Sequence, residues 1–216
     1  MLFRSDVPKA TQEKCLERLA EEMGLGTAFG TDAVAGVESA RKALADGVNR
    51  TRVIVVGLGI AALVAATGGL ALAAAPGVAG AAAVTSALAA FGPGGMIGGL
   101  LTAGTLITAG GGSIAVGLAG VGTSAASVEA VVITQLAAAL LRKKQGIEQD
   151  PQTWAGFTQL EMEIAKELAR LEAVSDDDAK SLKELRRKLI TVQRAIACLQ
   201  SEGLGYAPPA LLDGEG

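Results

Sequence analysis

VIVVGLGIAALVAATGGLALAAA, residues 53–75, decides which class of fold this chain can adopt. The stretch contains 23 consecutive residues without a charged side chain, and nearly all of them are apolar. At a rise of about 1.5 Å per residue, a helix of this length extends roughly 34 Å, enough to cross a hydrocarbon core about 30 Å thick. The stretch therefore predicts a transmembrane helix.

The apolar character continues far beyond residue 75. Between Arg52 and Arg142 the only ionisable side chain in the sequence is Glu129. Breaks follow at Pro76 and Gly77, at residues 91–95 and at the triple glycine 110–112, so the pieces 78–91 and 96–109 are short, whereas 113–141 continues apolar. Two or four crossings both fit this pattern.

Basic residues flank both ends of the apolar region: Arg50, Arg52, Arg142, Lys143 and Lys144. Basic flanks favour the cytoplasmic side of a membrane. We therefore expect both termini to be cytoplasmic and the number of crossings to be even.

The composition suits helix contacts in lipid. Half of the residues are hydrophobic but only 3% are aromatic, and glycine occurs 29 times. Glycines let helix backbones approach closely where no hydrophobic force drives helices together. The expected packing or oligomerisation glycines are Gly94, Gly95, Gly98, Gly99, Gly104, Gly110, Gly111, Gly112 and Gly117. The same surface fits packing within one protomer and association between copies.

Glu129 has two interpretations. A carboxylate at mid-membrane costs roughly 2.5–3.5 kcal/mol on insertion scales, so such a group usually faces protein or water. The residue lies either near the start of a last helix over 125–141 capped by Thr123, or in a position facing a pore.

Several classes of chemistry are excluded by the residue types. The chain has no histidine, which removes the usual hydrolase triads and histidine-ligated zinc. Its two cysteines, Cys15 and Cys198, are far apart and form no CxxC pattern. No basic face for nucleic acid is present. We expect no enzymatic activity, no cofactor and no metal site.

Amphipathic helices are expected before the apolar region. Thr11 is the predicted N-cap of a helix that runs to about Met23 and stops at Gly24. Thr31 or Asp32 is the predicted cap of a second helix. These helices pack either on their own protein or on a bilayer surface.

A helical hairpin is expected after the basic triplet. Residues 152–174 carry apolar side chains along one face, and Ser175 is placed to cap a following helix. That helix has a coiled-coil spacing of 3 and 4 at Leu182, Leu185, Leu189, Val192, Ile196 and Leu199. The short connection predicts an antiparallel pair.

Residues 91–120, FGPGGMIGGLLTAGTLITAGGGSIAVGLAG, resemble the glycine-rich segment of the small interferon-alpha-inducible mitochondrial membrane proteins and of related bacterial membrane modules. Gly110, Gly111, Gly112, Ala115 and Gly117 carry the match, which covers about a seventh of the chain. The resemblance implies an organelle or bacterial cytoplasmic membrane, helix bundling and membrane perturbation in defence or cell death.

The predicted fold is an all-α membrane protein in four parts: amphipathic helices at 1–51, a glycine-rich transmembrane region at 52–144, a helical hairpin at 145–201 and a flexible tail at 202–216. The preferred function is a homo-oligomer that permeabilises a bilayer or forms a pore. A second hypothesis is a membrane anchor or scaffold that recruits a partner protein through residues 152–200. A third is a protein that shields residues 53–141 among its amphipathic helices until it is triggered.

Overall fold

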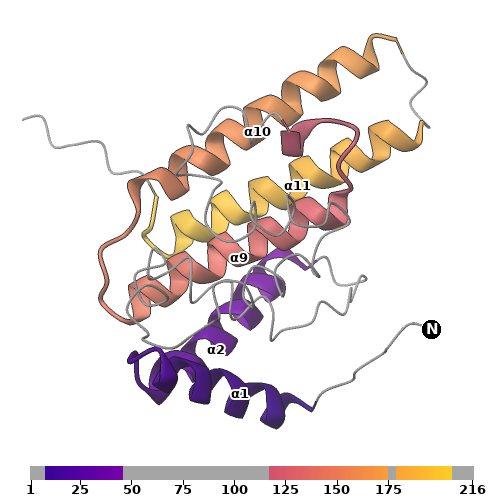
Figure 1. Cartoon of the computed structure of the whole chain (residues 1–216). Coiled ribbons are helices and arrows are strands. Elements are labelled where there is room, and N and C mark those ends of the chain that lie inside the picture. Colours follow the sequence, from indigo (N-terminus) through magenta and orange to yellow (C-terminus); the bar gives the residue numbers. More distant parts are fainter. Residues whose placement is uncertain (1–7, 46–116, 175–178, 206–216) are drawn as a thin grey trace, which may run out of the picture.

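The computed structural model describes residues 8–45, 117–174 and 179–205. Over these ranges the chain forms helices and turns and contains no strand. The helices are α1 (Lys9–Glu22), α2 (Thr27–Leu44), α9 (Ala125–Lys144), α10 (Pro151–Glu172) and α11 (Lys180–Ser201), and Figure 1 shows them stacked in the order α10, α11, α9, α2, α1. The all-α prediction is confirmed for this part of the chain. Residues 53–75, the predicted transmembrane helix, lie outside the described residues.

The first two helices begin earlier than the sequence predicts. α1 starts at Lys9 after Pro8, without a side-chain cap from Thr11. α2 starts at Thr27, because Gly24 (φ +71°) and Gly26 (φ +80°) reverse the chain within a few residues. Gly24 is the predicted stop of the first helix.

The two residues expected to cap α2 instead form contacts between helices. The Thr31 hydroxyl donates a 2.9 Å hydrogen bond to the Glu17 carboxylate on α1. Asp32 forms an ion pair with Lys144 at the end of α9, at 2.6 Å. The cap predictions were wrong because a polar side chain near a helix start also fits a site facing another helix.

Close backbone packing joins α1, α2 and α9. A Cβ atom added at Gly30 would lie 2.4 Å from the backbone nitrogen of Glu17, and one at Gly36 would lie 3.2 Å from the carbonyl oxygen of Ala137. Neither site has room for a larger side chain without movement of the neighbouring helix. Glycine in the interior of α2 is therefore explained by the closeness of its neighbours.

α9 is the central helix of the structure. Its N-cap is Ser124, whose hydroxyl oxygen accepts a 3.1 Å bond from the Ser127 amide, whereas Thr123 donates to the Gly117 carbonyl. The helix continues through the basic triplet to Lys144 instead of ending at residue 141. Eleven of its residues are buried: Val128, Val131, Val132, Ile133, Thr134, Gln135, Leu136, Ala137, Ala138, Ala139 and Leu141.

α9 is also the one helix among the described residues that is long and apolar enough to cross a membrane. Within the protein, 61% of its most apolar window is buried. The helices packed against it are α2 and α11. A buried core helix passes the same test of length and composition, so this feature alone is weak support for a membrane span.

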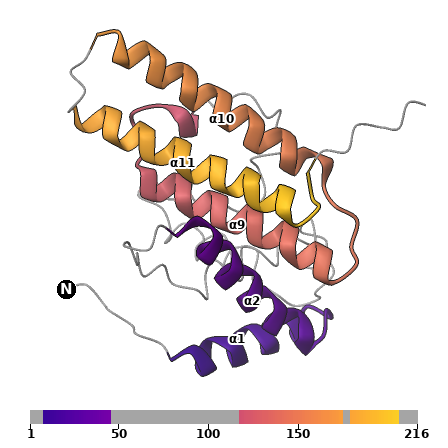
Figure 2. The same cartoon turned by 180° about the vertical axis from the view of Figure 1, so that it is seen from behind.

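α10 and α11 lie side by side at one edge of the structure (Figure 2). Glu172 pairs with Arg186 at 3.0 Å, and Glu161 accepts a 3.0 Å bond from Gln193. Moving back along α10 therefore means moving forward along α11, so the helices run in opposite directions. The predicted cap at Ser175 lies outside the described residues.

The buried face of α11 differs from the predicted seam. Its buried side chains are Leu182, Leu185, Lys188, Val192, Ala195 and Leu199, whereas Leu189 and Ile196 are half-buried. A coiled-coil seam faces one neighbouring helix, whereas α11 packs against α10, α9 and α2. Several neighbours bury a wider face and rotate its centre toward Lys188.

Candidate functional site

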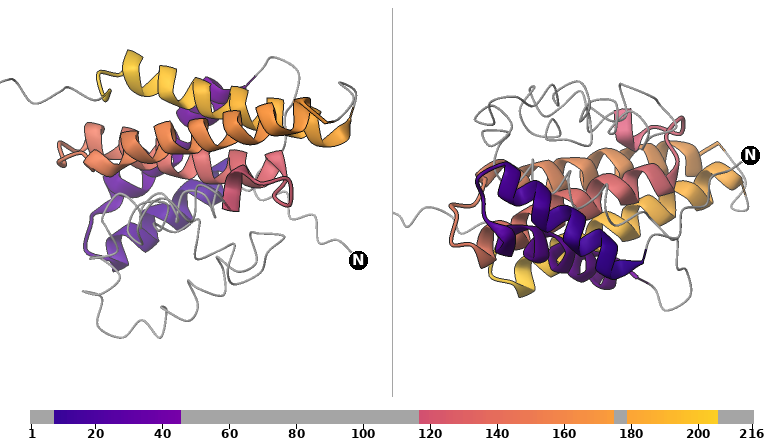
Figure 3. Two further views of the ribbon diagram at one scale, coloured as in Figure 1. Left: turned by 90° about the horizontal axis from the view of Figure 1, so that it is seen from above. Right: turned by 60° about the horizontal axis from the view of Figure 1, so that its bottom comes forward.

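The candidate site is formed by the described residues that come directly before and after residues 46–116 in the sequence. We call residues 46–116 the interposed segment; they lie outside the described residues, between the end of α2 and the helical residues 117–119. α2 packs directly against α9, and α11 packs against both helices (Figure 3). Buried side chains of α2, α9, α10 and α11 belong to one continuous hydrophobic core.

Lys188 of α11 bonds to residues that follow the interposed segment. Its side chain is completely buried. The ammonium donates to the carbonyl oxygens of Leu118 at 3.1 Å and Gly120 at 2.8 Å. Leu118 is one of the helical residues 117–119 and Gly120 directly follows them, and carbonyl groups at the end of a helix lack partners within it and favour a cation.

The burial of Lys188 has an electrostatic consequence. Burial lowers the pKa of its ammonium below the ordinary value, and the carboxylates of Glu184 and Glu167 oppose this shift. The two carbonyl bonds compensate part of the free energy lost when the charge leaves water. The site is thus polar and dehydrated in the middle of an otherwise apolar helix face.

Glu184 lies one turn before Lys188 on α11. Its carboxylate accepts a 2.9 Å hydrogen bond from the backbone amide of Ala125, the first residue of α9. Amides in the first turn of a helix have no partner within the helix, and the positive end of the helix dipole favours a carboxylate. Glu184 and Lys188 therefore hold the start of α9 and the residues just before it.

Arg194 of α11 bonds to the end of α2, shortly before the interposed segment. Its guanidinium donates a 3.0 Å hydrogen bond to the carbonyl oxygen of Leu44, the last residue of α2. Lys188 and Arg194 are six residues apart, or about 9 Å along the helix axis. One short stretch of α11 consequently bonds to residues on both sides of the interposed segment. We call Glu184, Lys188 and Arg194 the α11 clamp.

Most of the glycines predicted for helix packing lie outside the described residues, namely Gly94, Gly95, Gly98, Gly99, Gly104, Gly110, Gly111 and Gly112, and so do Arg50 and Arg52. Gly117 is exposed, and a Cβ atom added there would meet nothing within 4 Å. It makes no close helix contact of the kind that Gly30 and Gly36 make within this part of the chain.

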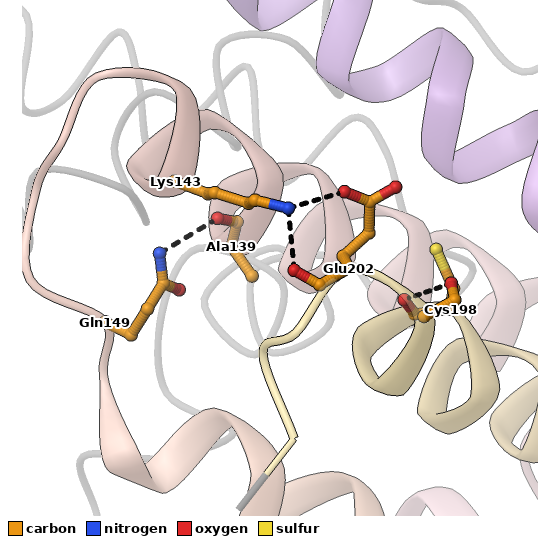
Figure 4. Close-up of polar contacts among 6 residues, drawn as sticks. Ala139, Lys143, Gln149, Cys198 and Glu202 are labelled. Atoms are coloured by element: carbon orange, nitrogen blue, oxygen red, sulfur yellow. Dashed lines mark hydrogen bonds and ion pairs between the residues drawn. The ribbon is translucent and has the colours of Figure 1, made fainter.

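The basic triplet that ends α9 bonds to other parts of the protein. Arg142 donates to the carbonyl of Glu148 at 3.3 Å. Lys143 donates to both the backbone carbonyl and the carboxylate of Glu202, at 2.6 and 2.8 Å, as Figure 4 shows. With the pair between Lys144 and Asp32, all three charges take part in contacts with other elements of the bundle or its connections.

Glu129 is half-buried in the second turn of α9. It is the fifth residue of the helix, which begins at Ala125. The position fits the interpretation that the residue lies near a helix start. A role facing a pore stays a prediction.

An open groove of about 720 Å³ lies beside the pairs made by Lys143 and Lys144. Cys198 lies on its wall, and burial raises the pKa of that thiol, with a further contribution from the Glu202 carboxylate. A raised pKa disfavours the reactive thiolate. Within residues 8–45, 117–174 and 179–205, no group of three metal-binding side chains occurs.

No protein-family model, curated protein or solved structure matches this chain. The candidate site therefore stands on its own geometry.

The residues that sequence reasoning missed are Gly30, Gly36 and the α11 clamp. Two glycines inside an amphipathic helix are a signal of close packing, because each costs about 1 kcal/mol relative to alanine in an isolated helix. The spacing of Lys188 also indicates that it lies on the apolar face of the helix, because it follows Leu185 by three residues and precedes Val192 by four. The partners of Glu184 and Arg194 could not be predicted from the sequence, because they are backbone atoms of distant segments.

Proposed function

We propose that the protein permeabilises a lipid bilayer, using the interposed segment as its membrane-active part and the helical bundle as its carrier. The observation that carries the proposal is the contrast between the two. Residues 53–116 hold 64 positions without an ionisable side chain, whereas the described helices form a core with charged residues on their outer faces. A long charge-free segment joined to such a bundle is suited to insertion into lipid.

The packing of the bundle supports a particular topology. α2 precedes the interposed segment and α9 follows it, and the two helices pack against each other. Both ends of the segment are then on the same side of any membrane that it crosses, so the number of crossings is even. Residues 53–116 are 64 positions, which suffice for two spans of about 20 residues but not for four. We propose two crossings and cytoplasmic termini.

Glycine is the basis for the oligomeric part of the proposal. The pairs Gly94 with Gly98 and Gly95 with Gly99 have the four-residue spacing that brings helices close in lipid. Two crossings from one chain enclose no conducting path, so several copies contribute to a pore. Glu129, in the second turn of α9, is proposed to lie near the pore mouth. The resemblance of residues 91–120 favours a defence or cell-death effector.

The direct test is release of a fluorescent dye from liposomes by the purified full-length protein. Val64→Lys places a charge at the centre of residues 53–75, which costs roughly 2.5–3.5 kcal/mol on insertion scales. The matched control is Met162→Lys, because Met162 is 60% exposed on α10. We expect release by the wild type and by the control but not by Val64→Lys. Absence of release by the wild type at every protein density contradicts the proposal.

A second candidate function is a membrane scaffold that binds a partner protein through α10 and α11. The observation in its favour is that three of the four exposed large apolar side chains of the described residues, Met162, Val174 and Ile190, lie on α10, on α11 or shortly after α10, while the fourth, Val121, precedes α9. The double variant Met162→Asp/Ile190→Asp changes two exposed side chains and leaves the core in place. If this variant no longer recruits a partner protein to liposomes, and the liposomes stay sealed with the wild type, the scaffold is supported over the pore.

A further inference from the structure

The open groove beside the C-terminal end of α9 lies between α2, α9 and the end of α11. Its volume of about 720 Å³ lies within the range of sites that bind small organic ligands. Leu140 and Leu141 of α9 contribute apolar surface to it. The wall from α2 consists of residues that share one face of that helix and have small side chains, namely Ala35, Gly36, Ser39 and Ala43.

Five charged side chains also line the groove, and their charges do not cancel. Three are the ammonium groups of Lys42, Lys143 and Lys144, and two are the carboxylates of Asp32 and Glu202. The lining therefore carries one net positive charge. Both carboxylates are already paired, Asp32 with Lys144 at 2.6 Å and Glu202 with Lys143 at 2.8 Å. A ligand with a single negative charge is complementary to this set.

The ammonium groups keep hydrogen-bond donors for such a ligand, because each lysine has three N–H groups. Lys143 directs two of them to Glu202, and Lys144 directs one to Asp32. Lys42 is exposed and makes no hydrogen bond or ion pair within the part of the chain that the structure describes. The groove can therefore donate to an anion while both ion pairs stay in place.

The combination of charge and apolar lining favours one kind of anion. A phosphodiester carries one negative charge and presents several acceptor oxygens, and lysine is a common partner of phosphate groups. In a phospholipid, the glycerol and the first acyl carbons next to the phosphate are apolar enough to contact the α2 wall and Leu140. Basic pockets between helices bind anionic lipid headgroups in this way. An acidic peptide fits less well, because its further charges approach the carboxylates of Asp32 and Glu202.

We propose that this groove binds the headgroup of an anionic phospholipid, with phosphatidylglycerol as the simplest member of the class. The phosphate oxygens accept from Lys42, Lys143 and Lys144, and the glycerol contacts the apolar walls. The inference goes beyond permeabilisation, because it assigns lipid recognition to the bundle itself. It leaves α2 packed on α9 as the structure has them.

The test is a titration of the isotope-labelled full-length protein in a nonionic detergent, followed by the amide chemical shifts of the residues that line the groove. The probe is dihexanoyl phosphatidylglycerol below its critical micelle concentration. Dihexanoyl phosphatidylcholine is the matched control, since it differs only in its zwitterionic headgroup. Glycerophosphoglycerol, the same headgroup without acyl chains, and a hexaglutamate peptide test the two other sources of negative charge.

Three variants test the site from the side of the protein. Lys42→Gln removes the ammonium that has no partner, and Ser39→Glu adds a carboxylate to the α2 wall and cancels the net charge. Lys180→Gln is the matched control, because Lys180 is exposed at the start of α11, about 27 Å along the helix from Cys198 in the groove. All three positions are exposed, and circular dichroism shows that each variant keeps its helices.

We expect phosphatidylglycerol, but not phosphatidylcholine, to shift the amides of the groove. Lys42→Gln is expected to weaken binding about fivefold, as for an exposed ion pair, and Ser39→Glu about tenfold, whereas Lys180→Gln binds as the wild type does. Equal binding of the two lipids, or unchanged binding by Lys42→Gln and Ser39→Glu, overturns the proposal.

The other two probes also decide the source of the ligand. If glycerophosphoglycerol binds as tightly as the lipid, the ligand is a soluble phosphodiester and the lipid assignment is wrong. If hexaglutamate binds more tightly, the groove is a site for an acidic protein segment and the proposal is likewise wrong. The titration does not depend on dye release, so failure of the lipid site and failure of the proposed function are distinguishable.

Discussion

The buried ammonium of Lys188 donates a 2.8 Å hydrogen bond to the carbonyl oxygen of Gly120, 68 positions earlier in the chain. This bond joins α11 to residues that follow the interposed segment. With the bond from Arg194 to Leu44, α11 contacts described residues on both sides of that segment in the sequence.

The pH dependence of stability reports on the charge of Lys188. An unfolded lysine has a pKa of about 10.4, whereas burial lowers the pKa in the fold. Between the lowered pKa and about 10.4 the unfolded chain binds more protons than the folded one, so this group's contribution to stability rises with pH in that range. Denaturation of the wild type and Lys188→Met in detergent at several alkaline pH values measures the difference.

We expect the wild type to gain stability relative to Lys188→Met as the pH approaches 10.4. Lys180→Met, which replaces an exposed lysine at the start of α11, is the matched control for removal of a lysine side chain. A wild-type advantage that falls with rising pH contradicts the assignment of Lys188 as a buried ammonium whose pKa is lowered.

Alanine at three glycines tests the packing of the helices. Gly30→Ala places a Cβ 2.4 Å from backbone on α1 and is expected to cost roughly 1–3 kcal/mol, the usual range for overpacking. Gly36→Ala is expected to cost less, because its contact at 3.2 Å needs a smaller shift. Gly117→Ala meets nothing within 4 Å and is expected to change stability by less than about 0.5 kcal/mol.

Thermal melting followed by circular dichroism measures all three variants. The same Gly117→Ala variant tests the prediction that Gly117 packs between copies in lipid. In that case dye release falls although the stability of the protein is unchanged. Equal destabilisation by all three substitutions is the outcome that contradicts the packing at Gly30 and Gly36.

Removal of the Ser124 hydroxyl tests the start of α9. The hydroxyl accepts from the Ser127 amide, so Ser124→Ala is expected to cost about 1 kcal/mol. Ser39→Ala on the exposed face of α2 is the control and is expected to be nearly neutral. Urea denaturation of both variants provides the comparison, and an equal effect of the two contradicts the cap.

Neutralisation of Glu129 tests its proposed place at a pore mouth. A carboxylate on a conduction path attracts cations, so Glu129→Gln is expected to reduce the preference for K⁺ over Cl⁻. The measurement is the reversal potential in a planar bilayer under a KCl gradient. Glu21→Gln, exposed on α1, is expected to leave the reversal potential unchanged. An unchanged potential for Glu129→Gln places this carboxylate away from the ions.

The sequence by itself determined the all-helical character of the described regions, the extent of the charge-free tract and the approximate positions of the helices. These properties are local: apolar side chains recur with the helical period, and glycine in the left-handed region ends α1 at Gly24. Residues 152–174 were assigned to a helix from their spacing alone, and α10 runs from Pro151 to Glu172.

Only the tertiary structure decided which side chains are buried and what they bind. The periodicity of α11 favoured Leu189 and Ile196, but contact with α10, α9 and α2 buries Lys188 and Ala195 instead. The partner of Arg194 is a carbonyl 150 positions away, and a backbone acceptor leaves no mark in the residue type. Helical spacing specifies a face on one helix, whereas the neighbours that cover that face depend on packing across the whole chain.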